Sequence, residues 1–84
     1  MEKYPEKTFE NFYNAVRQDF IEFNKRLSEQ EVDRYLKSEE ESIKDDYEMH
    51  SRRLKNHEIE EEVFWIGCVS AVANCLSLMY EPEE

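Results

Sequence analysis

The chain has 84 residues, enough for one domain, and its 21 acidic and 11 basic side chains give a formal net charge of −10. This charge repels nucleic-acid phosphates and anionic membranes, which argues against direct nucleic-acid binding. One glycine and two prolines leave few turn residues for a β-rich fold, whereas the abundant Glu, Lys, Leu, Arg and Gln favour helices. The composition therefore predicts a single all-α domain over residues 1–84.

The N-terminal part of the chain divides into an arm and a first helix. Residues 1–7 show no periodicity and are expected to form an N-terminal arm. Apolar residues then recur at steps of three and four over residues 9–27, which predicts an amphipathic helix. Thr8 is its expected N-cap, because a threonine hydroxyl can accept a hydrogen bond from the first turn.

A second helix start is encoded at Ser28 and Glu31, which fit a capping box. The serine hydroxyl can accept from the Glu31 amide while the glutamate carboxylate returns to the Ser28 amide. Residues 38–41 repeat this pattern in a polar segment. Either one long helix passes through that segment or the chain bends near Ser38, and a short helix followed by a longer one is the favoured prediction.

The longer helix is charged except for one narrow apolar stripe, which suits packing against a single neighbour. Asn56 is expected to end it, because asparagine tolerates the left-handed conformation found at helix ends and can also cap a new start. The stripe consists of Ile43, Tyr47, His50 and Leu54.

The segment Val63–Tyr80 contains no charged residue, although acidic runs lie before and after it. It predicts a final helix from about Glu58 to Tyr80 that is apolar over most of its circumference and must be covered by other helices, by a second copy or by lipid. The favoured fold is a small bundle of three to four helices around this central C-terminal helix, with the phenylalanines of the first helix packed on it. Residues 81–84 form an acidic tail.

Membrane insertion of Val63–Tyr80 is the less favoured alternative. Its 18 residues are at the lower limit for spanning a bilayer. Ser70, Asn74 and Ser77 are polar, and no Lys or Arg flanks the segment closely. A buried bundle helix in a cytoplasmic protein is therefore expected, and the start of the chain lacks the order of residues typical of a secretory signal.

Small residues on the final helix suggest a self-association face. Such residues let a second backbone approach closely. A domain of this size buries only about 60% of the surface of its unfolded chain, so a homodimer would add burial. The predicted face consists of Gly67, Ser70, Ala71 and Asn74.

No catalytic or cofactor site is predicted. Cys68 and Cys75 lie in the most apolar part of the chain and are expected to be buried, reduced and structural, since a reactive thiolate needs an exposed, electropositive setting. Spacing alone makes four residues candidate ligands of a transition metal, but no metal is expected because the zinc-peptidase and di-iron patterns are missing. These candidate ligands are Asp46, His50, His57 and Glu61.

The acidic clusters suggest a partner of opposite charge. Rows of carboxylates on rigid helices can imitate nucleic-acid phosphates and occupy the groove of a basic nucleic-acid-binding protein such as a nuclease. The predicted function is a non-enzymatic, stoichiometric protein-binding module. The alternative is a self-assembling helical protein whose acidity only confers solubility. The predicted partner-binding residues are Glu29, Glu31, Asp33, Glu39, Glu40, Glu41, Asp45, Asp46 and Glu48.

Overall fold

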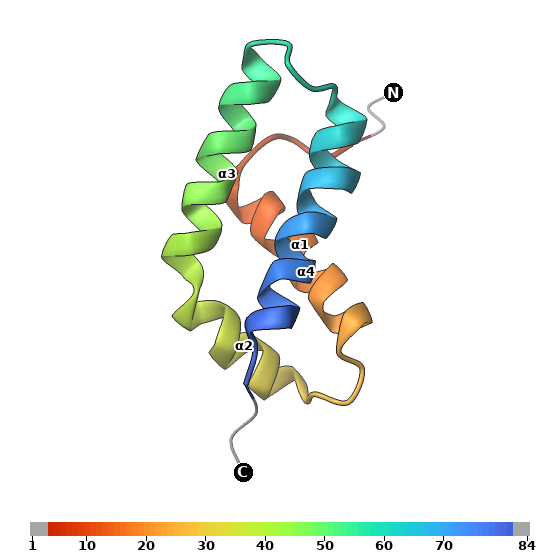
Figure 1. Ribbon diagram of the computed structural model, residues 1–84, viewed down its shortest axis with the longest axis vertical. Helices are drawn as coiled ribbons and strands as arrows, with labels where there is room; N and C mark the ends of the chain where they lie inside the picture. The colour runs from red at the N-terminus through yellow and green to blue at the C-terminus, as the bar shows by residue number, and fades with distance from the viewer. Residues whose placement is uncertain (1–3, 82–84) are drawn as a thin grey trace.

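The computed structural model describes residues 4–81 and confirms the all-α bundle (Figure 1). A π-helical segment, η1, runs directly into α4, and the two are called the C-terminal helix below. In Figure 1 this helix crosses in front of α1, while α3 runs along the left side and α2 closes the lower end. The elements are α1 (Phe9–Phe23), α2 (Glu29–Ser38), α3 (Glu40–Lys55), η1 (Val63–Cys68) and α4 (Val69–Met79).

Both predicted N-terminal caps form. The Thr8 hydroxyl accepts a hydrogen bond from the Asn11 amide at 3.1 Å. The Ser28 hydroxyl accepts from the Glu31 amide at 3.2 Å, and the Glu31 carboxylate accepts from the Ser28 amide at 3.3 Å, which completes the capping box. These bonds satisfy amides that have no partner within their helix, so they define where α1 and α2 begin.

The end of α1 and the boundary between α2 and α3 differ in detail from the sequence pattern. α1 ends at Phe23, four residues before the end of the apolar pattern, and the Asn24 side-chain amide donates to the Phe20 carbonyl at 3.0 Å. The predicted bend near Ser38 is confirmed, because Glu39 separates α2 from α3. The second capping box does not form, since the Ser38 hydroxyl donates back to the Tyr35 carbonyl at 2.6 Å.

A tight turn joins α3 to the C-terminal helix. Asn56 follows the last residue of α3, as predicted, but the residue with positive φ is His57, at 61°. The His57 amide donates to the Leu54 carbonyl and the Glu58 amide to the Arg53 carbonyl, a Schellman arrangement. Helical backbone resumes at residue 61, later than the expected 58, because the turn occupies the residues between.

The core is built on α1, which contacts α2, α3 and α4. Phe12, Val16 and Phe20 recur every four residues along its inner side and are fully buried. The Phe12 ring lies 5.5 Å from the Phe64 ring, so the expected packing of α1 phenylalanines on the C-terminal helix is confirmed. The other helices complete the core with Val32, Leu36, Ile43, Trp65, Cys68, Val69, Val72, Ala73 and Leu76.

The N-terminal arm and the acidic tail are only partly within the described residues. Residues 4–7 are not helical, and the Lys7 carbonyl accepts a hydrogen bond from the Tyr47 hydroxyl of α3 at 3.3 Å. Tyr4 packs against the core. Residues 1–3 of the predicted arm and 82–84 of the predicted tail lie outside the described range. Within residues 4–81, no helix is long and apolar enough to cross a membrane.

The C-terminal helix is covered on one side only. In η1, Phe64 and Cys68 lie four residues apart and both are buried. Ile66, Leu78 and Met79 instead expose 57%, 79% and 58% of their surface. Other helices of the single chain therefore cover only part of the apolar circumference, because α1 and α3 pack on the opposite side of this helix.

Candidate protein-interaction surfaces

The nine predicted partner-binding carboxylates all lie at or near the surface of α2 and α3, but not on one face. Glu39 and Asp46 are half-buried and the others are exposed. Helical geometry separates them, because side chains share a face only at spacings of three, four or seven. The exposed members are Glu29, Glu31, Asp33, Glu40, Glu41, Asp45 and Glu48.

Several of these carboxylates are engaged within the fold. Glu31 closes the capping box of α2. Asp33 forms an ion pair with Arg17 of α1 at 2.7 Å, and this hydrogen bond raises the pKa of Arg17. Together with burial, which is the larger cause, the charges of Glu40 and Asp33 raise the pKa of Tyr13 on α1. Glu31 and Asp33 therefore already have partners within the bundle, and Glu40 is close enough to Tyr13 for its charge to act on that hydroxyl.

One group remains free and aligned. Glu41, Asp45 and Glu48 are spaced by four and three residues, so they form a line on the outer side of α3, opposite Ile43. We call these three residues the acidic stripe. No member forms an ion pair within residues 4–81. The outer side of α2 does not continue the stripe, because it carries Arg34 and Lys37.

The uncovered side of the C-terminal helix forms a second surface, which we call the neutral face. The predicted self-association residues lie on it: Gly67, Ala71 and Asn74 are exposed and Ser70 is half-buried. The large apolar side chains of this face were not predicted from the sequence to be exposed. Their exposure could have been inferred, because the apolar stripe of α3 is too narrow to cover a second side of the C-terminal helix. The neutral face consists of Val63, Ile66, Gly67, Ser70, Ala71, Asn74, Cys75 and Leu78.

Gly67 is the single glycine of the chain, and the fold of the single chain does not require glycine at this position. A Cβ atom placed there would meet only Val63 Cγ1, at 3.7 Å, which is an ordinary contact. Glycine within a helix costs roughly 0.5–1 kcal/mol relative to alanine. The helix therefore gives up stability at an exposed position where alanine would fit.

Ser77, a polar residue of the same helix, belongs to the bundle rather than to the neutral face. It is half-buried and exchanges hydrogen bonds with the Asn24 side chain just after α1, at 3.0 and 3.3 Å. This pairing ties the end of α1 to the end of α4. It also separates Ser77 from Asn74, which stays exposed.

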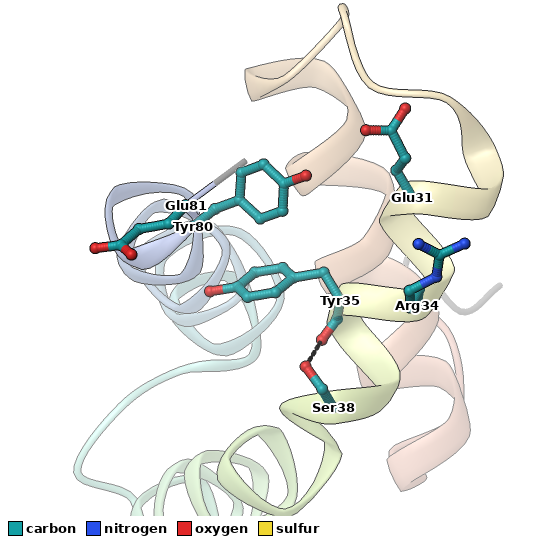
Figure 2. A pocket seen from close by; sticks show the side chains of 6 residues that line it. All are labelled: Glu31, Arg34, Tyr35, Ser38, Tyr80 and Glu81. Atoms are coloured by element: carbon teal, nitrogen blue, oxygen red, sulfur yellow. Dashed lines mark hydrogen bonds between the residues drawn. The ribbon is translucent and has the colours of Figure 1, made fainter. Parts of the chain in front are cut away.

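A hollow of about 440 Å³ lies between α2 and the end of the C-terminal helix. Figure 2 shows the rings of Tyr35 and Tyr80 together at its centre, and their centroids are 4.8 Å apart. The Tyr35 hydroxyl donates to the Leu76 carbonyl at 2.9 Å, and burial raises the pKa of Tyr35. The lining offers charged groups for ion pairs but no nucleophile with a neighbouring base. The charged lining residues are Glu31, Arg34 and Glu81.

The two cysteines occupy different environments. Cys68 is buried, as predicted, and burial raises the pKa of its thiol. Cys75 is exposed on the neutral face, so the prediction that both thiols are buried is wrong for Cys75. The reason is the one-sided packing of the C-terminal helix. Both thiols are free, and they do not form a disulfide with each other.

The residues weighed for metal binding do not converge. The helix is broken at residues 56–60, so His57 and Glu61 do not continue the α3 face that carries Asp46 and His50. No group of three or more His, Cys, Asp or Glu residues in the described part of the chain is placed to hold a metal ion. His50 instead contacts Arg53, with 3.2 Å between Nδ1 and Nη1, and burial followed by the Arg53 charge lowers its pKa.

Comparisons with known proteins add no relative to this picture. The chain matches no protein-family model, no curated protein and no solved structure. The acidic stripe and the neutral face are therefore interpreted from their own chemistry.

Proposed function

We propose that this protein is a non-enzymatic binding module that docks its acidic stripe on a basic surface of another protein. The observation that carries the proposal is the alignment of Glu41, Asp45 and Glu48 on one exposed side of α3, free of ion pairs with the described residues. The helix fixes the backbone that carries the three carboxylates, so binding a cationic surface orders their side chains but not their backbone.

The partner class follows from the charge and spacing of the stripe. The rise of an α-helix places successive stripe carboxylates about 4.5–6 Å apart along its axis, the same order as the roughly 3.4 Å of duplex axis per phosphate of one DNA strand. A groove that binds nucleic acid is lined by Lys and Arg, so a nucleic-acid-binding protein such as a nuclease is the expected partner. The net charge of −10 would speed the encounter at low ionic strength.

The test is a binding comparison between two charge-reversed triple variants. In the first, Glu41, Asp45 and Glu48 are each changed to Lys. In the control, the exposed residues Glu6, Glu22 and Glu58, which lie away from the stripe, receive the same change. Each protein is immobilised and exposed to lysate of its source cells at low and high salt, and bound basic proteins are identified by mass spectrometry and titrated individually.

We expect the stripe variant to weaken binding at least about tenfold and the control to weaken it much less. Binding should fall with added salt and with competing duplex DNA. Equal losses in both variants would show that only total charge matters. The absence of any basic partner at low salt would overturn the proposal.

A self-assembling helical protein is the second candidate function. The observation in its favour is the neutral face, which is uncharged and uncovered in the single chain. Under this candidate the acidic stripe only keeps the protein soluble, and its charge reversal would leave assembly intact.

A further inference from the structure

The neutral face combines exposed apolar side chains with a complete lack of charge. Ile66 and Leu78 are more than half exposed, and Val63 exposes 46% of its surface. Scattered apolar residues are normal on protein surfaces, but a contiguous apolar patch marks an interaction site. Charged residues make up 38% of this chain, yet none occurs from Val63 to Tyr80.

The middle of this face is shaped for close approach of a backbone. Gly67 and Ala71 are four residues apart and share one side of the helix. Alanine would fit at Gly67 in the single chain, where its Cβ would meet only Val63 at 3.7 Å. Glycine therefore leaves a shallow notch at an exposed position, between the larger side chains of Ile66 and Leu78.

The charge pattern argues against a basic partner as the occupant and permits a second copy of this chain. A basic partner would gain its attraction from carboxylates, and the neutral face contains none. A second copy, at −10, is repelled wherever acidic surfaces meet, but no charge within this face opposes it. We propose that the neutral face is the interface of a homodimer in which two C-terminal helices pack antiparallel.

The antiparallel orientation follows from the sizes of the side chains that face each other. With the two-fold axis between Ser70 and Ala71, Val63 lies opposite Leu78 of the other copy, and Gly67 lies opposite Asn74. The large apolar residues at the two ends thus meet each other, and the notch receives a residue of moderate size. In a parallel pair, Gly67 would lie opposite Gly67 of the second copy and the notch would stay unfilled, whereas glutamates meet at the ends in either orientation.

The available area sets the strength of the dimer. At 1.5 Å per residue the face is about 24 Å long, and a helix is about 10 Å wide, so each copy contributes roughly 240 Å². Stable complexes bury about 800 Å² per partner. We therefore expect a weak dimer that forms in the micromolar to millimolar range and that salt strengthens, because salt screens the acidic ends.

The first experiment is sedimentation equilibrium of the full chain from about 10 μM to 1 mM, at low and high salt. The mass should rise from 10.3 kDa toward twice that value, more strongly at high salt. Ile66→Glu and Gly67→Leu should each weaken association at least about tenfold. The matched control is Met49→Glu, an equally polar change at an exposed apolar residue of α3. Circular dichroism checks that each variant is folded.

Disulfide trapping tests the orientation. Ala71→Cys in a Cys75→Ser background places thiols beside the axis, where an antiparallel dimer allows a bridge. Cys75 in the natural chain should not bridge to its copy, because antiparallel packing separates the two by about 13 Å along the axis, beyond disulfide reach. A rapid Cys75 bridge would overturn the antiparallel arrangement.

A monomer at 1 mM in both salts, or equal loss of association in Met49→Glu, would overturn the neutral face as a dimer interface. The proposed function fails separately, because partner binding through the acidic stripe weakens with salt whereas dimerisation strengthens. Failure of the dimer proposal therefore leaves the acidic-stripe proposal to be tested separately, and the reverse also holds.

Discussion

The outer sides of α3 and of the C-terminal helix are two long exposed helix faces with opposite chemistry. The α3 face carries the acidic stripe, whereas the face of the C-terminal helix contains no charge over 18 residues. A charged outer face is what a helix in water normally shows, since it keeps the single chain soluble. A neutral outer face leaves apolar surface uncovered. The two faces therefore suit different surroundings: the α3 face suits water, and the face of the C-terminal helix suits contact with another surface.

The largest expected effect tests which side of the C-terminal helix is the core. Phe64→Ala should lower the free energy of unfolding by about 3–5 kcal/mol, because it removes a fully buried ring. Ile66→Ala, two residues further on, should lower it by less than about 0.5 kcal/mol. Urea denaturation at low micromolar concentration measures both. Similar losses at the two positions would mean that the neutral face is part of the core of the single chain.

A substitution in the turn between α3 and the C-terminal helix should raise the stability of the fold. His57 has a φ of 61°, a conformation that costs a residue with a Cβ about 1–2 kcal/mol and that glycine adopts freely. His57→Gly should therefore raise the free energy of unfolding by about 1 kcal/mol, seen as a higher Tm. The control is Asn56→Gly, where φ is −87° and glycine should give no gain. A loss of stability in His57→Gly would contradict the Schellman turn.

A smaller gain is expected on the neutral face itself. Gly67→Ala should stabilise the monomer by about 0.5–1 kcal/mol, because the added Cβ meets only one ordinary contact. The reverse change one turn later, Ala71→Gly, should cost a similar amount. Thermal unfolding at low concentration is the measurement. A destabilising Gly67→Ala would show that the single chain needs glycine there, which would weaken the contrast between the two faces.

The smallest effect is a pH dependence on α3. Burial and Arg53 lower the pKa of His50, so the unfolded chain takes up this proton at higher pH than the folded chain does. Stability should therefore fall as the pH drops from about 7.5 through the ordinary histidine value near 6.5. His50→Gln should flatten this slope. An unchanged slope in His50→Gln would exclude His50 as its source.

The sequence alone predicted only part of the candidate sites. The acidic residues were identified correctly as surface groups, but spacing alone did not show that Glu31 and Asp33 are engaged in a cap and an ion pair. The pairing of Asp33 with Arg17 joins two residues that are 16 positions apart in sequence, and such contacts have no local signature. The exposure of Cys75 was missed for the same reason, since it depends on which side of its helix other elements cover.

By itself, the sequence determined that the chain is helical and where most of its helices begin and end. Thr8, Ser28 and Asn56 could be assigned because caps and turns depend on groups within about four residues. Only the tertiary structure decided how much of the C-terminal helix the bundle covers. Gly67, Ser70 and Asn74 mark its outer side in the sequence. The exposure of Ile66, Cys75 and Leu78 beside them depends on where the distant side chains of Phe12 and Phe20 pack against this helix.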